Sequence, residues 1–135
     1  MNDADLRHIL QTCRTIAVVG LSPKPERASY GVALYMRRMG YRIVPVNPGQ
    51  SEILGEICYA SLSEIPFAVQ MVNVFRNEAD VLPIARESLA LGAACFWQQL
   101  GIANVQAEDL VRGAGMCSVM DRCLKIEHQR LGASL

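Results

Sequence analysis

Ile16-Ala-Val-Val-Gly-Leu-Ser-Pro-Lys-Pro-Glu-Arg27 is the stretch of sequence from which the fold follows. Its first four residues form an apolar run typical of a buried strand, and Gly20 then allows a tight turn. A loop with two prolines and two cations, Lys24 and Arg27, leads into a pattern that predicts an amphipathic helix. Such a junction directs backbone N–H groups and a helix N-terminus at one point, which is how α/β proteins hold phosphate.

The loop differs from the standard nucleotide-binding loops. The dinucleotide pattern G-x-G-x-x-G would place glycines at positions 22 and 25, where this chain has Ser22 and Pro25. The pattern G-x-x-x-x-G-K-[ST] of nucleotide hydrolases occurs nowhere in the sequence. The sequence therefore predicts a phosphate site of another type.

The composition is typical of one compact domain covering residues 1–135. The chain has 135 residues with 51% hydrophobic and 19% charged content, enough to bury a single core. Thirteen basic and thirteen acidic side chains cancel, so nothing in the net charge favours nucleic acid or membrane, and any anion site must be local. The first residues lack the basic-then-apolar order of a signal peptide, so we expect a cytoplasmic location.

Apolar runs alternate with helical patterns along the whole chain. We expect helices at 4–12, 28–39, 78–91, 105–113 and 121–131, a capped helical turn at 61–64, and strands at 15–20, 41–46, 57–59, 69–75, 94–98 and 116–119. This alternation has the spacing of βαβ units. The sequence therefore predicts an α/β fold, a single Rossmann-like three-layer domain with a mostly parallel sheet.

Polar, cationic and aromatic side chains follow the ends of the expected strands. In open parallel sheets, ligands bind outside the carboxyl ends of the strands, so these residues are the candidate site. They are Gly20, Leu21, Ser22, Lys24 and Arg27 after the first strand, Asn47 and Pro48 after the second, Phe75 and Arg76 after the fourth, and Trp97 in the fifth. A flat ligand with anionic groups fits this set. Any one of these cations, taken alone, is more simply interpreted as a solvated loop residue.

The residues after the second strand bear on which nucleotide is bound. NAD sites usually present an Asp or Glu there to bond the ribose hydroxyls. This chain has Asn47-Pro48, and the next carboxylate is Glu52. Without that acid, the site tolerates a ribose that carries an extra phosphate, as in NADP or coenzyme A.

Six segments, in order along nearly the whole chain, resemble one known family. They are 18–27, Gly40-Tyr-Arg-Ile-Val-Pro-Val-Asn-Pro48, Ile53-Leu-Gly-Glu56, Val74-Phe-Arg76, Trp97-Gln-Gln-Leu-Gly101 and Met120-Asp-Arg-Cys123 with Ile126-Glu127. The chain is similar to the small bacterial CoA-binding-domain proteins, which are related to the CoA-binding domain of succinyl-CoA synthetase. The resemblance implies a Rossmann-like fold that binds coenzyme A, with the phosphates on Gly20–Arg27, the adenosine by Asn47-Pro48, and Phe75-Arg76 and Trp97 along the rest.

The chain departs from that family at two positions. Many relatives carry acidic residues in the strand before Phe-Arg, where this chain has Gln70 and Asn73. We expect both to lie in a buried strand and to need hydrogen-bond partners. We expect the loss of these charges to change either an internal hydrogen-bond network or the preference for a ligand.

No catalytic set emerges from the sequence. His8 is expected in solvent and His128 in a surface ion pair with Glu127, while the five cysteines lack the spacing of a zinc site or a disulfide framework. Cys58, Cys95 and Cys117 are expected in the core. Cys123, at an expected helix start after Arg122, has a reactive role only as the minor alternative.

The leading hypothesis is a module that binds CoA or acyl-CoA without an active site of its own, as a sensor or a subunit. An NADP-linked oxidoreductase and a scaffold that keeps the fold without a ligand are the alternatives. A homodimer or an enzyme partner is left open, with Met36, Met39 and Met116 as residues for a dimer face or, in preference, for the core.

Overall fold

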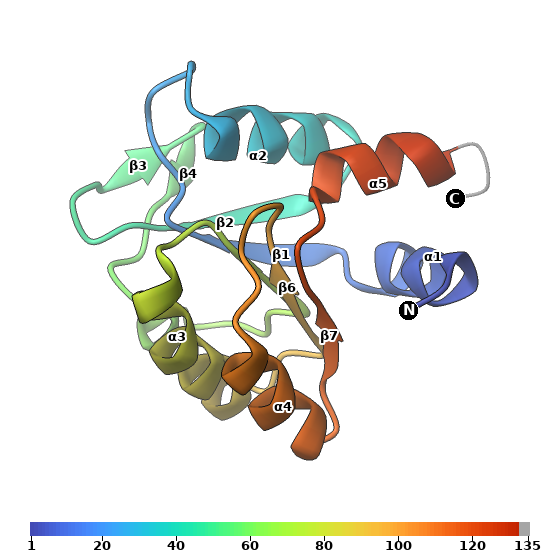
Figure 1. Cartoon of the computed structure of the whole chain (residues 1–135). Coiled ribbons are helices and arrows are strands. Elements are labelled where there is room, and N and C mark those ends of the chain that lie inside the picture. The colour runs from blue at the N-terminus through green and yellow to red at the C-terminus, as the bar shows by residue number, and fades with distance from the viewer. Residues whose placement is uncertain (133–135) are drawn as a thin grey trace.

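Five parallel strands form the central sheet, in the order β2-β1-β5-β6-β7 (Figure 1). The computed structural model describes residues 1–132. Its elements are α1 (Asp3–Thr12), β1 (Thr15–Val19), α2 (Ala28–Arg38), β2 (Arg42–Val46), β3 (Glu52–Ile53), β4 (Glu56–Ile57), the 3₁₀ helix η1 (Leu62–Glu64), β5 (Met71–Val74), α3 (Glu78–Leu91), β6 (Cys95–Gln98), α4 (Val105–Gly113), β7 (Cys117–Val119) and α5 (Leu124–Leu131). The α/β class with a parallel sheet, expected from the sequence, is confirmed.

Helices cover both faces of the sheet. Alternate residues of each strand point to opposite faces, so both faces carry apolar side chains that pack against helices. Ile16 and Val18 pack with residues of α1, α2 and α5, while Ala17 and Val19 pack with residues of α3 and α4. Figure 1 shows the two helical layers on either side of the strands. The longest helix, α3, has 14 residues, and none of the helices in residues 1–132 is both long and apolar enough to cross a bilayer.

Two expected elements differ from the structure. The strand expected at 57–59 is replaced by an antiparallel hairpin of β3 and β4, and Tyr59 joins the main sheet only through a single bridge to Val46. The last helix starts at Leu124 and not at 121, because Asp121 has a φ of 58° and its Oδ1 accepts a hydrogen bond of 2.7 Å from the Gly101 N–H. The loop after β6 is thereby tied to the loop after β7.

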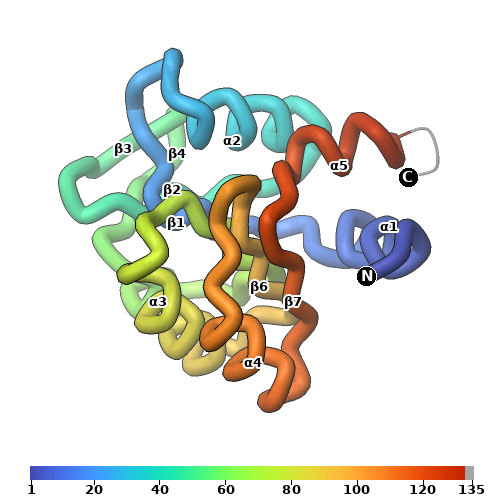
Figure 2. Tube along the Cα trace, viewed as in Figure 1, coloured from blue at the N-terminus to red at the C-terminus, as the bar shows by residue number. Residues whose placement is uncertain are grey.

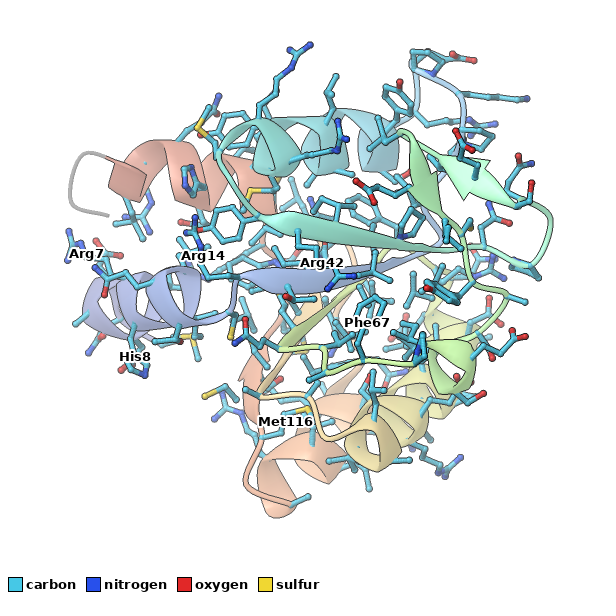
Figure 3. The ribbon with its side chains drawn as sticks, turned by 180° about the vertical axis from the view of Figure 1, so that it is seen from behind. Arg7, His8, Arg14, Arg42, Phe67 and Met116 are labelled. Carbon is cyan, nitrogen blue, oxygen red and sulfur yellow. The ribbon has the colours of Figure 1, made fainter. Side chains whose placement is uncertain are left out.

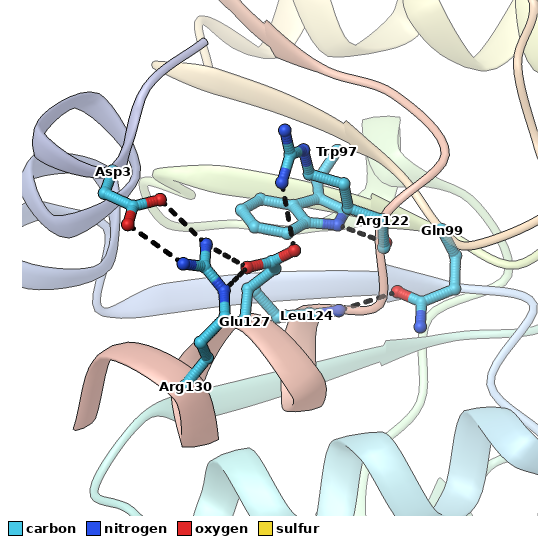
Figure 4. A network of polar contacts seen from close by, with 7 residues as sticks. All are labelled: Asp3, Trp97, Gln99, Arg122, Leu124, Glu127 and Arg130. Carbon is cyan, nitrogen blue, oxygen red and sulfur yellow. Dashed lines mark hydrogen bonds and ion pairs between the residues drawn. The ribbon is translucent and has the colours of Figure 1, made fainter.

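The first and last helices lie against each other (Figure 2). Arg130 donates two hydrogen bonds of 2.9 Å to the carboxylate of Asp3, and these lower the pKa of that carboxyl. Arg130 also pairs with Glu127, which in turn pairs with Arg122 at 3.1 Å (Figure 4). Glu127 is therefore engaged by two arginines and not by its neighbour His128.

His128 is buried between two tyrosines, so the expected surface ion pair with Glu127 is wrong. The Tyr35 hydroxyl lies 2.7 Å from Nδ1, and the rings of Tyr35 and Tyr41 meet the imidazole edge to face. Arg14, labelled in Figure 3, stacks over the Tyr41 ring at 3.9 Å. Burial lowers the pKa of His128, and the Arg14 guanidinium lowers it further.

The same kind of stacking protects the outer edge of the sheet. β2 is an edge strand, and Arg42 at its start places its guanidinium 3.8 Å from the centre of the Phe67 ring. Figure 3, which views the molecule from behind, shows the two labelled side chains close to each other. A charged residue at an edge strand disfavours pairing with another chain.

His128 gives the stability a defined pH dependence. Because its pKa is lower in the folded chain than the ordinary 6.5, the unfolded chain takes up a proton that the folded chain excludes. We expect the free energy of unfolding to fall as the pH drops below about 6.5, and His128→Gln to reduce that fall, in urea titrations between about pH 7.5 and 5.5. An unchanged slope in His128→Gln would contradict the assignment.

Candidate functional site

The strand order reverses between β1 and β5, which are neighbours at the centre of the sheet. From β1 the chain passes to α2 on one face, whereas from β5 it passes to α3 on the other. The two loops therefore leave in opposite directions and open a crevice at the carboxyl edge, the usual ligand position in such sheets. The loop at 20–27 and the loop at 75–77 form its walls.

Gly20 is the point where these two loops touch. Its φ is +86°, and its N–H donates a 2.9 Å hydrogen bond to the carbonyl of Val46. A Cβ atom on Gly20 would lie 2.3 Å from the carbonyl oxygen of Phe75. Phe75 is itself fixed, because its N–H donates to the Val19 carbonyl at 2.9 Å. Only glycine allows both the backbone conformation and the close approach.

The loop after Gly20 is held on the first turn of α2. The Ser29 hydroxyl, which is buried, accepts a 3.0 Å hydrogen bond from the Ser22 N–H, and the Ser22 hydroxyl accepts one of 3.1 Å from the Lys24 N–H. The Arg27 N–H donates to the Lys24 carbonyl at 3.1 Å. The loop is thus a closed set of turns, and the side chains of Lys24 and Arg27 remain exposed at its rim.

The N-terminus of α2 is left open to an anion. The other four α-helices of residues 1–132 carry an acidic residue in their first turn, and α2 carries none. Its first two amides, those of Ala28 and Ser29, donate to no described residue, and Arg27 at the cap position offers them no side-chain acceptor. Neither Lys24 nor Arg27 forms an ion pair with any described carboxylate. Free amides, the helix dipole and two uncompensated cations therefore meet at one point.

Three neighbouring cavities lie along this edge. The central cavity, of about 300 Å³, is lined by Gly20, Ser22, Lys24, Arg27, Ala28, Ser29 and Phe75. The β2-side cavity, of about 240 Å³, shares Gly20 with it and lies between the ends of β1 and β2, η1 and α3. The β6-side cavity, of about 400 Å³, shares Ala28 and Phe75 with it and reaches the start of α5. Arg76 lines both outer cavities, so the three form one elongated site.

Asn47 and Leu21 support the loops without lining the cavities. The Asn47 amide donates a 2.9 Å hydrogen bond to the carbonyl of Leu21, and its Oδ1 accepts one of 2.9 Å from the Gly49 N–H. The Leu21 side chain is fully buried in the core on the α2 side. Asn47 thus joins the loop after β2 to the loop after β1, while its neighbour Pro48 lines the β2-side cavity.

Trp97 does not line the site, contrary to the expectation from the sequence. Its side chain is 0% exposed, and its indole N–H donates a 2.8 Å hydrogen bond to the carbonyl of Arg122 (Figure 4). The reason is strand alternation, which directs Trp97 into the core under α5. The residues that reach the cavity come slightly later in the chain, namely Gln99, Leu100 and Ile102.

Gln70 and Asn73 have different surroundings. Gln70 precedes β5 and is exposed, so its expected place inside a buried strand is wrong; its Oε1 accepts hydrogen bonds from the N–H groups of Arg14 and Thr15, which a carboxylate would also accept. Asn73 is fully buried, and its Nδ2 donates to Oε1 of Gln99 at 3.2 Å. An ionised Asp could not donate to Gln99, so the amide at this position suits the glutamine beside it.

The β2-side cavity also has a wall that the sequence did not reveal. Leu62 of η1 and Pro83 and Ile84 of α3 supply apolar surface, with Ser61 and Glu87 at the margin. The capping box of Ser61 and Glu64 was visible in the sequence and is confirmed. Its place over the end of β2 depends on the bridge between Tyr59 and Val46, a contact that local sequence patterns do not encode.

The family comparison agrees with this geometry. Residues 14–129 match the model of the CoA binding domain. The chain belongs to this family. It is 41% identical over 125 residues to the uncharacterized protein YneT of Bacillus subtilis, covering 93% of each chain. The sequence resemblance to CoA-binding-domain proteins is thereby confirmed.

Two solved structures show the range of the family fold. The protein described as cell-free ID.343 from Thermus thermophilus superimposes with a TM-score of 0.93 at 41% identity, over 97% of this chain and 99% of that one. The apo form of the dinucleotide-forming acetyl-coenzyme A synthetase 1 of Ca. Korarchaeum cryptofilum superimposes with a TM-score of 0.67 at 25% identity, over 78% of this chain but 25% of the synthetase. The same arrangement thus occurs both as a small protein and as one part of a larger synthetase.

The contact of Gly20 with Phe75 predicts a large effect of a single methyl group. We expect Gly20→Ala to lower the free energy of unfolding by about 2 kcal/mol or more, because a side chain there combines a positive φ with a clash against backbone. Gly31→Ala is the matched control, since nothing lies within 4 Å of a Cβ at that helical position. The control should be neutral or more stable by up to about 1 kcal/mol. Equal urea midpoints for Gly20→Ala and wild type would refute the close-approach argument.

Asn47 predicts a smaller effect through its two hydrogen bonds. Asn47→Ala should lower the free energy of unfolding by about 1–3 kcal/mol, since the Leu21 carbonyl and the Gly49 N–H lose their partner. The exposed Gln50→Ala should stay within about 0.5 kcal/mol of wild type. Thermal or urea unfolding compares the two variants, and equal stabilities would show that Asn47 does not join the loops.

Proposed function

We propose that this protein binds coenzyme A or an acyl-CoA along the three cavities, as a non-catalytic sensing or subunit module. The observation that carries the proposal is the open N-terminus of α2, where two free amides and two unpaired cations surround the central cavity. That arrangement attracts a multiply charged anion. Membership of the CoA-binding-domain family supports coenzyme A as this anion.

The phosphates would occupy the central cavity. The amides of Ala28 and Ser29 would donate to phosphate oxygens, and Lys24 and Arg27 would add charge-assisted hydrogen bonds from the rim. Because Gly20 has no side chain, the backbone there would approach the ligand from the sheet side, just as it approaches the backbone of Phe75. The proposal thus gives the glycine, the free amides and the two cations of the loop one common role, the binding of phosphate.

The adenosine would lie in the β2-side cavity. Val46, Pro48, Leu62 and Ile84 line this cavity and offer apolar surface to a purine ring. The residues directly after β2 carry no carboxylate to bond a ribose 2′-hydroxyl or to repel a ribose phosphate. Arg76 lies at the margin, paired with Asp80 at 3.0 Å on an exposed surface that leaves it free to exchange partners.

The pantetheine arm would extend into the β6-side cavity. This cavity is the largest of the three and continues from the central one past Ala28 and Phe75. Val32 and Ile102 provide apolar walls, and Asn77 and Gln99 provide polar groups for the amides of the arm. An elongated ligand with phosphates at its middle matches this order of cavities.

The non-catalytic part of the proposal rests on the same cavities. Neither histidine lines them, since His128 is enclosed by Tyr35 and Tyr41 and His8 lies by the amino end of β7. Within residues 1–132, no three His, Cys, Asp or Glu side chains gather as a metal site would require. A histidine base or a metal-bound water at the ligand is therefore not part of the proposed function.

Calorimetric titration with CoA, dephospho-CoA and NADPH tests the ligand. We expect CoA to bind, and dephospho-CoA to bind more weakly if a cation contacts the 3′-phosphate. NADPH that bound more tightly than CoA would favour the oxidoreductase alternative. The absence of heat with all three ligands would favour a scaffold without a ligand.

Two arginines at opposite ends of α2 test the proposed position of the phosphates. Arg27→Ala should lower the affinity for CoA about 10- to 150-fold, equivalent to about 1.5–3 kcal/mol for a lost charge-assisted hydrogen bond. Arg38→Ala removes the same charge at the opposite end of α2, where the side chain is exposed, and should change the affinity less than about twofold. Equal effects of the two substitutions would mean that Arg27 acts only through net charge or faces solvent.

A further inference from the structure

The β6-side cavity contains a thiol to which the binding proposal gives no role. Cys123 lines this cavity, is partly exposed, and occupies the cap position of α5. Its thiol makes no hydrogen bond with any described residue. The sulfur therefore lies in the wall of the cavity, at the start of α5, without a hydrogen-bond partner among the described residues.

A side-chain amide with one unpartnered end lies in the wall of the same cavity. Gln99 is 5% exposed, and its Oε1 accepts hydrogen bonds from Nδ2 of Asn73 at 3.2 Å and from the Leu124 N–H at 3.3 Å. Figure 4 shows the Leu124 contact, which fixes the amide beside the start of α5. Its Nε2 donates to no described residue. A molecule in this cavity that offers a carbonyl oxygen would therefore give this N–H group an acceptor.

The other cysteines are placed differently. Cys13, Cys58 and Cys95 are buried, and burial raises the pKa of each thiol. Cys117, expected in the core, is instead exposed, because it begins the edge strand β7 at the amino end of the sheet. Among residues 1–132, Cys123 is thus the cysteine that lines the proposed binding edge.

We infer that Cys123 is a site for a mixed disulfide with coenzyme A, formed by exchange with the disulfide of two CoA molecules. The inference rests on the proposed function, because it needs the phosphates in the central cavity and the pantetheine arm in the β6-side cavity. Gln99 would donate its free amide N–H to a carbonyl of the arm, next to the sulfur. The protein would then hold CoA covalently when CoA disulfide is abundant and reversibly when thiols are abundant.

The exchange balances without another reagent. Cys123 loses its proton to solvent, and its thiolate attacks one sulfur of CoA disulfide. The new bond joins Cys123 to one CoA as the original sulfur–sulfur bond breaks. The second CoA leaves as a thiolate and takes up a proton, and an excess of free thiol reverses the reaction.

Peptide mapping of the wild-type protein tests the site directly. The reduced protein is mixed with CoA disulfide, and the modified cysteines are identified by mass spectrometry after digestion without reductant. We expect one CoA, less two hydrogens, on Cys123, formed at least about tenfold faster than on the more exposed Cys117, because binding holds the disulfide beside the sulfur. Labelling of Cys117 at an equal or higher rate would overturn the inference.

Two matched comparisons show whether Cys123 reacts because the ligand is bound beside it or because its thiol is reactive towards any disulfide. Cys117→Ser should take up CoA as the wild type does, whereas Cys123→Ser should lose the fast phase. With 2-hydroxyethyl disulfide, which lacks the nucleotide, the preference for Cys123 should disappear. A preference that persisted with this small disulfide would contradict binding as its cause.

Calorimetry with CoA under reducing conditions keeps the two proposals apart. Wild-type protein that binds reduced CoA but shows no preferred labelling of Cys123 would refute the disulfide site and leave the CoA module intact. Wild-type protein that binds no reduced CoA would refute the module itself, and the disulfide site with it.

Discussion

The close approach of Gly20 to the carbonyl of Phe75 is the constraint on which the rest of the site depends. It brings together the ends of β1 and β5, the two strands between which the sheet order reverses. The central cavity and the β2-side cavity both meet at Gly20, and Phe75 separates the central cavity from the β6-side cavity. A larger residue at position 20 would push these loops apart and alter all three cavities at once.

The proposed preference of this edge for anions has an electrostatic basis. The chain has no net charge, so the preference comes from the local placement of a few groups. The absence of an acid in the first turn of α2, the exposed Lys24 and Arg27 and the free amides of Ala28 and Ser29 all act in the same direction. By contrast, five other arginines in residues 1–132 form ion pairs, as Arg130 does with Asp3 and Glu127.

Patterns with a strong local cause could be predicted from the sequence. The apolar run before Gly20, the capping box at Ser61 and the helix at 78–91 all have the predicted structure. Features that depend on long-range packing could not be predicted from the sequence. Trp97 is at the right edge but points into the core, and His128 is enclosed by Tyr35 and Tyr41, which lie about ninety residues earlier in the sequence. Neither side chain's environment is encoded by its neighbours.

The central claim is that a phosphorylated ligand sits on the open N-terminus of α2. An amide NMR titration of isotope-labelled protein with CoA tests it most directly, because the free N–H groups of Ala28 and Ser29 report on phosphate themselves. The claim predicts saturable shifts, largest for residues 20–29 and 75–77, with little change at the opposite edge around Cys117. Shifts that were largest around Cys117, or no shifts at saturating CoA, would contradict it.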